Sequence, residues 1–387
     1  MKVYGRCAVS EFLADRVVYR GLVPADRRLP SLEALRRNVN LPDSLVPRKS
    51  DPEYARVVAL ILRQARQLEA PRAALKKLVF IGDTRVLDAN AFNNICQAGG
   101  WSGLAFIGSE TVDPPSVKLE KTTGGETVFL SNRWSALNEA TNEVSGFPSF
   151  SEFCAARDFL PGENTVLLID LDKTAIGARG RNAGVIDQAR VHAIEQTVSS
   201  LLAASFDRIA FRLVYDQLNQ PEYHPFTADN QDYLAYICLI LGGSLFQFSE
   251  LLTAIHSGQL HDFQQFIRLV EARKAELPSP LRDIHKEIYT NVNRGDPTPF
   301  KPFRYNEYRA TVGRMGHFPD DTPLSKMLTE EILITQEVRS LALAWQAQGT
   351  LVFGLSDKPD EASLPTPELA AQGYLPLHQN ETHAVGV

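Results

Sequence analysis

Three short apolar runs that each end in a polar residue constrain the fold of this chain most strongly. The runs cover residues 78–81, 165–169 and 351–355. Unbroken apolar runs of this length are typical of strands that are buried on both faces of a parallel sheet. A polar residue follows each run at once or after one glycine: Asp83, Asp170 and Ser356. The sequence therefore predicts a sheet with polar side chains along its carboxyl edge.

Helices are expected between these strands. One begins at Pro52, because proline needs no N–H partner in the first helical turn. Another begins near Leu87 and ends at Gly99-Gly100. Further strands are expected at 104–108 and 127–130, with a helix near 134–141. Alternating strands and helices imply an α/β fold with a mostly parallel, Rossmann-like sheet and helices on both faces.

The rest of the chain divides into less regular segments. Residues 1–48 contain many prolines and are expected to be loops with short elements, and residues 145–164 are expected to form a connector. A helical stretch is expected from about 185 to 320, a long helix from Thr322-Pro323 to Gly349, and a short strand at 383–387. The expected domains are a first sheet part (1–184), an inserted helical domain (185–320) and a second sheet part (321–387).

One part of the helical stretch is expected to lack helix. Residues 297–318 carry closely spaced aromatic and basic side chains, and we expect a loop packed at the edge of the helical domain. Contact with a phosphorylated substrate or with RNA is the alternative for residues 300–314.

Size, charge and cysteine content exclude several classes of protein. A chain of 387 residues fits two domains, at about 100–200 residues per domain. The net charge of −6 gives no general attraction to nucleic acid or anionic membranes. The four cysteines show no CxxC spacing, the start lacks the apolar core of a signal peptide, and the longest apolar run, 233–246, is too short to span a bilayer. We therefore expect a cytoplasmic protein without a nucleic-acid or membrane partner.

The acids beyond the strands suggest a metal site. Ligands of open parallel sheets bind beyond the carboxyl ends of the strands, so Asp83, Asp88, Asp170 and Asp172 are expected to converge. Clustered carboxylates repel each other unless a cation lies among them, and Mg²⁺ prefers oxygen ligands. Each acid could instead cap the helix after its strand. For Asp83 considered by itself, helix capping and metal binding are equally good explanations.

Four segments together resemble the haloacid dehalogenase (HAD) superfamily of aspartate-nucleophile phosphohydrolases. Residues 165–174 resemble the first motif of that family, a strand followed by DxDxT, and Ser356 after its strand resembles the second. Lys49 at a helix start resembles the third motif, and residues 82–88 resemble the fourth, GDxxxxD. Lys173 departs from the glycine that many members have before the threonine. The family fold is a HAD-like sheet with a helical cap domain inserted between the first and second motifs.

The order of the motifs differs from that of the family. Here the third and fourth motifs precede the first and second. A circular permutation accounts for this order, with the usual chain ends joined through residues 145–164 and new ends between the second and third motifs. The alternative is a chance Lys49/Asp83 pair in an unrelated N-terminal domain.

The resemblance also implies chemical roles. Asp170 would be the nucleophile that forms an aspartyl-phosphate, and Asp172 would act as general acid and base. Mg²⁺ would be held by Asp83, by Asp170 and by Asp172 through its backbone carbonyl, with Asp88 as a further ligand or acting through water.

The same resemblance implies how the phosphate would be bound. Ser356 and Lys49 would bind the phosphate of a small phosphorylated substrate, with Lys49 also neutralising charge during catalysis and Thr174 supporting the phosphate loop. The implied function is a Mg²⁺-dependent phosphatase. A phosphotransferase or phosphomutase with the same residues, or a non-catalytic binding protein that kept the fold, are the alternatives. Asp172 favours phosphoryl transfer over dehalogenation.

Overall fold

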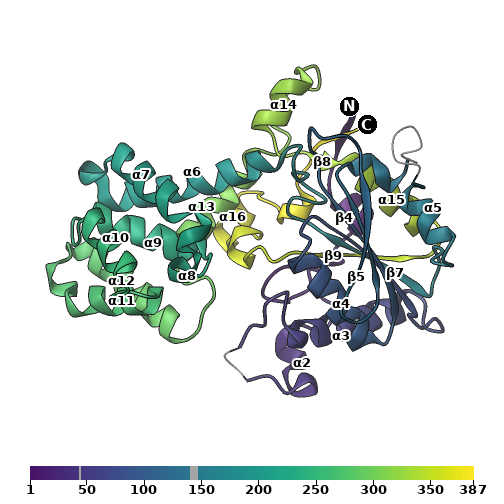
Figure 1. The fold of residues 1–387 in the computed structure, drawn as a ribbon, viewed down its shortest axis with the longest axis horizontal. Coiled ribbons are helices and arrows are strands. Elements are labelled where there is room, and N and C mark those ends of the chain that lie inside the picture. The colour runs from purple at the N-terminus through teal and green to yellow at the C-terminus, as the bar shows by residue number, and fades with distance from the viewer. Residues whose placement is uncertain (43–44, 140–146) are drawn as a thin grey trace. The chain divides into compact units, whose positions relative to one another are not determined.

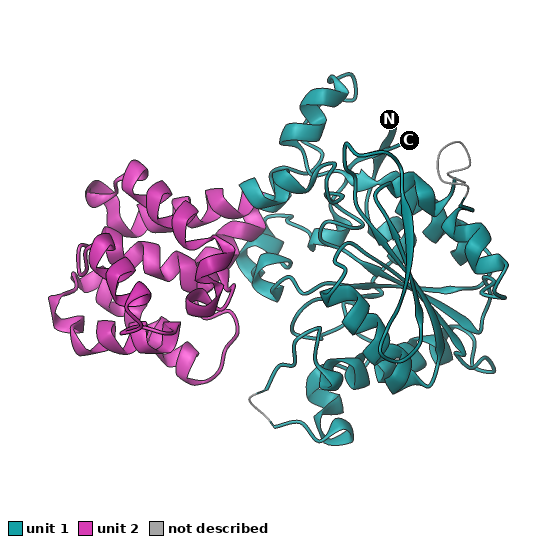
Figure 2. Ribbon diagram, in the orientation of Figure 1, with its two compact units in different colours: residues 1–188, 311–387 teal, residues 189–310 magenta. Residues whose placement is uncertain are grey.

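The computed structural model describes residues 1–42, 45–139 and 147–387. These residues form two compact units (Figure 2). Unit 1 contains residues 1–188 and 311–387, and unit 2 contains residues 189–310.

A seven-stranded sheet forms the centre of unit 1 (Figure 1). Its strands, in spatial order, are β2 (Val17–Val18), β9 (Leu351–Leu355), β7 (Thr165–Asp170), β3 (Lys77–Gly82), β4 (Ser102–Gly108), β6 (Thr127–Ser131) and β5 (Val117–Lys121). All neighbouring strands are parallel except β5, which runs antiparallel to β6. The predicted α/β fold with a mostly parallel sheet is confirmed, and it is consistent with a Rossmann-like architecture.

Both faces of this sheet are covered. Leu78 and Phe80 of β3 belong to one apolar core and Val79 and Ile81 to another, because successive strand residues point to opposite faces. The first core includes helices α2 (Leu32–Val39), α3 (Pro52–Glu69) and α4 (Leu87–Gly99). The second includes α1 (Ser10–Leu13), α5 (Phe150–Ala155) and α15 (Gln336–Gln346). Figure 1 shows α3 and α4 on one side of the sheet and α5 and α15 on the other.

A second, small sheet joins segments that are far apart in the sequence. Its order is β1 (Lys2–Cys7), β10 (Thr382–Gly386) and β8 (Ile334–Thr335). Strands β1 and β10 pair antiparallel, and β10 and β8 pair parallel. The N- and C-terminal strands of the chain therefore lie side by side (Figure 1).

Unit 2 is built from helices, and none of its residues, all of which are described, lies in a strand. The helices are α6 (Ala183–Leu202), α7 (Arg208–Leu218), α8 (His224–Thr227), α9 (Gln231–Gly242), α10 (Phe248–His256), α11 (Phe263–Ala272), α12 (Ser279–Asn293) and α13 (Lys301–Val312). Helix α6 begins, and α13 ends, in unit 1. A buried ion pair between Asp232 of α9 and Arg304 of α13, 2.5 Å apart, lies inside this unit.

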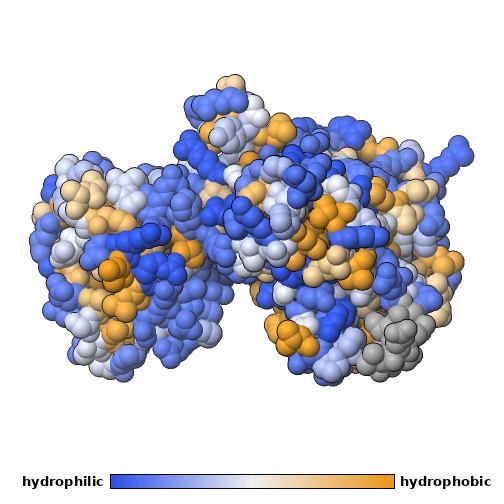
Figure 3. Space-filling model, turned by 90° about the horizontal axis from the view of Figure 1, so that it is seen from above, coloured by the Kyte–Doolittle hydropathy of each residue, from blue (hydrophilic) through white to orange (hydrophobic). Residues whose placement is uncertain are grey.

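On the face shown in Figure 3, hydrophilic residues surround small groups of apolar residues on both units. Within the described ranges, no helix combines the length and the apolar character that crossing a bilayer requires.

Two predicted elements are wrong. The helix expected from 322 to 349 is divided into α14 (Leu324–Glu330) and α15, with β8 between them. The backbone N–H of Leu333 donates to the side chain of Asn182 (3.0 Å), and β8 pairs with β10, so these backbone groups are satisfied outside a helix. The loop expected at 297–318 contains helix α13, whose Phe303 and Tyr308 are fully buried.

Two further segments differ from expectation. The connector expected at 145–164 contains helix α5, because Ser149 and Glu152 form a capping box at its start. Residues 145–146 lie outside the described residues. The helix expected near 134–141 is a single 3₁₀ turn at Trp134–Leu137, and residues 140–141 also lie outside the described residues.

Candidate active site

The carboxyl ends of three neighbouring strands bring the predicted polar residues to one edge of the sheet. Strands β9, β7 and β3 are adjacent and parallel. Asp170 ends β7 and lies opposite Leu355, the residue before Ser356. Asp83 follows directly on β3. Parallel pairing therefore brings together side chains from three distant parts of the sequence.

Three of the predicted acids form a compact buried cluster. Carboxylate oxygens of Asp83, Asp88 and Asp170 all lie within 4.8 Å of one another, and all three side chains are buried. Asp88 lies in the first turn of α4, where one of its oxygens accepts hydrogen bonds from the backbone N–H groups of Asp83 (3.0 Å) and Thr84 (2.8 Å). Gly82 permits this approach, because a Cβ at that position would lie 2.6 Å from the same oxygen. Asp88 therefore closes the turn between β3 and α4.

Lys49 joins the cluster from the segment before α3. Its Nζ lies 2.6 Å from Asp88 Oδ1 and 2.5 Å from Asp170 Oδ1, and its side chain is buried. Lys77, another lysine of this part of the chain, lies at the opposite end of β3 and pairs with Asp158. Lys49 is therefore the lysine that reaches the acids.

Burial and mutual repulsion shape the protonation of the acids. Burial, followed by the charge of Asp88, raises the pKa of Asp83 to about 6. Burial also raises the pKa of Asp170 well above its usual range, with Lys49 opposing this shift. Burial alone would raise the pKa of Asp88, but the charge of Lys49 and hydrogen bonds hold it below its usual range. Ionising all three acids together therefore requires positive charge in the cluster.

Arg179 is a member of the site that the sequence motifs did not indicate. Its Nε lies 2.5 Å from Asp83 Oδ2. Arg179 belongs to the loop between β7 and α6, which is fixed by Gly180 with φ +77°, where a Cβ would collide with the backbone of Glu110. Glycines at 177 and 180, both with positive φ, are the sequence signal that could have marked this loop.

Asp172 and Thr174 lie near the cluster without joining it. Asp172 Oδ2 is 3.7 Å from Lys358 Nζ, and Asp172 Oδ1 is buried without a hydrogen-bond partner among the described residues. Thr174 is fully buried, and its carbonyl accepts a hydrogen bond from Thr335 Oγ1 (2.5 Å). Between them, Lys173 adopts φ +64°, a conformation that favours glycine. Thr174 Oγ1 is likewise buried without a hydrogen-bond partner among the described residues, so both side chains keep an oxygen that no described residue binds.

Ser356 lies at the end of β9, where its backbone N–H donates to the carbonyl of Val18 (3.0 Å). Its Oγ accepts a hydrogen bond from the backbone N–H of Lys358 (3.0 Å), and both residues are buried. Lys358 is the second residue that sequence reasoning missed. Its position two residues after the second motif was the available signal.

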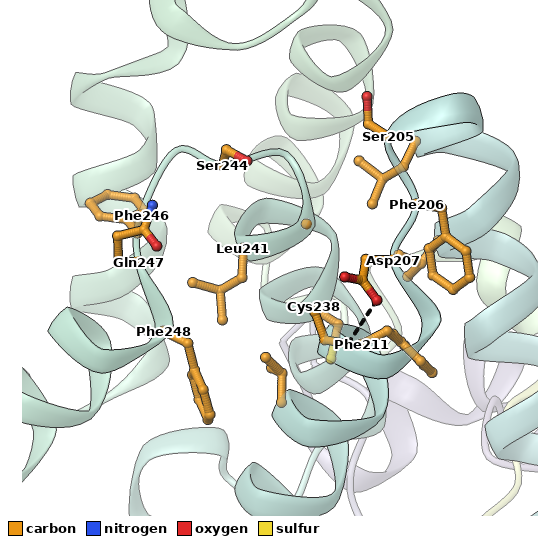
Figure 4. Close-up of a pocket in the computed structure, with 15 residues that line it drawn as sticks. Ser205, Phe206, Asp207, Phe211, Cys238, Leu241, Ser244, Phe246, Gln247 and Phe248 are labelled. Carbon is orange, nitrogen blue, oxygen red and sulfur yellow. Dashed lines mark hydrogen bonds between the residues drawn. The ribbon is translucent and has the colours of Figure 1, made fainter.

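A cavity in unit 2 offers a different kind of site (Figure 4). It has a volume of about 290 Å³, and its lining includes Phe206, Phe211, Phe246 and Phe248. Asp207 is the charged residue of the lining, and its carboxylate caps α7 by accepting from the N–H groups of residues 209 and 210. One helix-capping acid among aromatic rings provides surface for binding, but no group of acids and bases for catalysis.

No family model, no curated protein and no solved structure matches this chain. The chemistry of the site is therefore inferred from its own residues.

Proposed function

We propose that this chain is a Mg²⁺-dependent phosphatase of the HAD superfamily, with a circularly permuted motif order, that hydrolyses a small phosphorylated substrate. The buried cluster of Lys49 with Asp83, Asp88 and Asp170 carries this proposal. These residues come from the segments that resemble the third, fourth and first motifs of the family. A chance resemblance of separate segments gives no reason for them to meet in space.

The donor set of the cluster fits a magnesium ion. One carboxylate oxygen of Asp83 accepts a hydrogen bond from Arg179, and one of Asp170 accepts from Lys49. The second oxygen of each acid accepts no hydrogen bond from the described residues. Both oxygens of Asp88 are already engaged. Asp83 and Asp170 would therefore hold the ion directly, and Asp88 would act through water. Bound Mg²⁺ supplies positive charge to the phosphoryl group.

Asp170 would attack phosphorus with its carboxylate while the bond from phosphorus to the leaving oxygen breaks. Asp172 would give a proton to that oxygen, and would then take a proton from the water that hydrolyses the aspartyl-phosphate. Lys49 would neutralise charge on the phosphoryl group, which is the main requirement of phosphoryl transfer. Ser356 accepts its hydrogen bond from a backbone N–H, so its own hydroxyl proton is available to a phosphate oxygen.

Unit 2 would be the cap that selects the substrate. In the sequence it lies between Asp172 and Ser356, the interval in which the family inserts a cap. Its helical composition supports that role.

Phosphate release from p-nitrophenyl phosphate, followed by a panel of phosphorylated metabolites, tests the proposal. Activity should require Mg²⁺, should be removed by a chelator, and should be absent in Asp170→Asn. Lys77→Met, at the opposite edge of the sheet, serves as the matched control and should keep full activity. A pure, folded protein that released no phosphate from any substrate with Mg²⁺ would show that the proposal is wrong.

A further inference from the structure

A second buried lysine, Lys358, lies beside the acid that is proposed to move protons. Its side chain is only 1% exposed, and its Nζ is 3.7 Å from Asp172 Oδ2. Taking a lysine ammonium out of water is unfavourable unless an acid compensates for it. Asp172, whose side chain is 24% exposed, supplies such an acid. The carboxylate of Asp172 therefore stabilises the buried ammonium of Lys358.

The backbone on either side of this lysine is anchored. The N–H of Lys358 donates to Ser356 Oγ (3.0 Å), and its carbonyl accepts from the N–H of Arg20 (3.2 Å). One bond ties the residue to the end of β9, and the other ties it to the segment after β2. These two hydrogen bonds therefore fix the backbone of Lys358, from which its side chain extends to Asp172.

The two oxygens of Asp172 differ in their surroundings. Oδ2 faces the ammonium of Lys358, whereas Oδ1 is buried and has no hydrogen-bond partner among the described residues. A buried carboxylate oxygen without a partner is uncommon in folded proteins and calls for an explanation, such as an ordered water, a ligand or a catalytic role. An oxygen that must exchange a proton with substrate and water has to be left unbound in this way.

We propose that Lys358 is a positioning residue that holds Asp172 through Oδ2 and so reserves Oδ1 for proton transfer. This inference rests on the proposed phosphatase function and assigns a role to a residue outside the four motifs. In the first step, the proton on Oδ1 moves to the leaving oxygen as its bond to phosphorus breaks. In the second step, Oδ1 takes a proton from the water that attacks phosphorus, which releases Asp170 and inorganic phosphate.

Replacement of the lysine tests this role. Lys358→Met keeps the length of the side chain but removes its charge, Lys358→Arg keeps the charge, and Lys77→Met is the matched control on the same sheet. On alkyl phosphates, whose leaving oxygen needs a proton, kcat of Lys358→Met should fall by about 10–100-fold, which is less than the full contribution of a general acid, about 10²–10⁴-fold, because Asp172 itself remains. KM should change little, Lys358→Arg should recover part of kcat, and Lys77→Met should behave as wild type.

A second readout separates the two chemical steps. With p-nitrophenyl phosphate the leaving group needs little protonation, so phosphorylation of Asp170 should continue while hydrolysis of the phosphoenzyme slows. Acid-quenched Lys358→Met should therefore carry more phosphoenzyme than wild type. Unchanged kcat and unchanged phosphoenzyme in a folded Lys358→Met would refute the positioning role alone.

A double-mutant cycle distinguishes positioning from direct phosphate binding. If Lys358 acts through Asp172, Asp172→Asn combined with Lys358→Met should be no less active than Asp172→Asn alone. A further loss with a raised KM would overturn the inference, because it would mean that Lys358 binds the phosphate itself. The double variant leaves neither member of the ion pair charged, so this comparison also decides the question if Lys358→Met alone does not fold. Wild type without phosphatase activity would refute the proposed function, and this inference with it.

Discussion

Magnesium should stabilise this protein measurably, because its three clustered acids repel one another. With one oxygen of each acid within 4.8 Å of the others, two ionised carboxylates repel each other by about 3.5 kcal/mol at an effective dielectric constant of about 20. Lys49 and Arg179 offset part of this repulsion. A divalent cation that binds only the folded state removes more of it.

The size of the effect follows from mass action. A ligand at 100 times its dissociation constant stabilises the folded state by about 2.7 kcal/mol. At about 2 °C per kcal/mol for a unit of this size, Tm should rise by roughly 5 °C. Thermal unfolding followed by circular dichroism, with and without millimolar Mg²⁺ and at constant ionic strength, measures this shift.

Two substitutions locate the ion. Asp83→Asn removes one ligand oxygen and one repelling charge, so Tm without Mg²⁺ should not fall and the Mg²⁺-dependent rise should disappear. The partner left behind, Arg179, has a side chain that is 40% exposed and can be solvated. Asp158→Asn is the control, because Asp158 is an exposed acid paired with Lys77 at the other end of the sheet. It should keep the full rise.

Two results would refute this reasoning. One is a wild-type protein whose Tm does not respond to Mg²⁺. The other is an equal response in wild type and Asp83→Asn, which would mean that the ion binds elsewhere.

Three further predictions concern chemistry and stability. Asp170→Asn should form no phosphoenzyme with p-nitrophenyl phosphate, whereas Asp172→Asn should accumulate it and turn over about 10²–10⁴-fold more slowly, as acid quenching and phosphate release will measure. Asp232→Ala removes one of two buried acids that pair with Arg304, while Glu307 stays 2.6 Å away, and should lower the free energy of unfolding of unit 2 by about 1.5–3 kcal/mol in urea titrations. Burial lowers the pKa of His378, so the unfolded chain binds a proton that the folded chain does not. Stability should therefore be full above about pH 6.5 and fall below it by at most about 1.4 kcal/mol per pH unit, less steeply in His378→Gln.

Wild-type activity in pure Asp170→Asn would exclude that residue as the nucleophile. Asp216→Ala, which breaks a solvent-exposed pair with Arg212, should change the stability of unit 2 by only about 0.3–0.5 kcal/mol. An unfolding free energy of His378→Gln with the same pH dependence as wild type would show that other groups cause the loss.

The strands of the large sheet could be predicted because their signal is local. Residues 78–81, 165–169 and 351–355 are apolar on both faces, and each lies in a strand buried on both faces. Helices α3 and α4 could also be predicted from the sequence, since proline marks the start of α3 and glycine the end of α4. Such signals depend only on neighbours in the sequence.

The elements that were missed depend on partners far away in the chain. Leu333 bonds to the side chain of Asn182, and β8 bonds to β10, so the break between α14 and α15 leaves no local signal. Helix α13 was not predicted, because its aromatic residues, such as Phe303, are buried against other helices of unit 2. Their close spacing beside basic residues suggested a loop instead.

The same distinction applies to the candidate site. Lys49, Asp83, Asp88 and Asp170 could be named from motifs, because a short sequence places each at the start of a helix or the end of a strand. Arg179 reaches Asp83 through a loop fixed by glycines, and Lys358 reaches Asp172 from the end of another strand. Their roles depend on strand order, which no single segment encodes.

Strand order also explains why the unusual order of the motifs is compatible with a working site. The carboxyl ends of β9, β7 and β3 are neighbours in space whatever the order of these strands along the chain. Lys49 is separated by 39 residues from Asp88 and by 121 from Asp170. Because loop-closure entropy grows only with the logarithm of length, the longer separation costs about 1 kcal/mol more than the shorter one. That difference in free energy is smaller than the repulsion between two of the clustered acids. The proposed permutation would therefore keep the local geometry of the site at a small entropic cost.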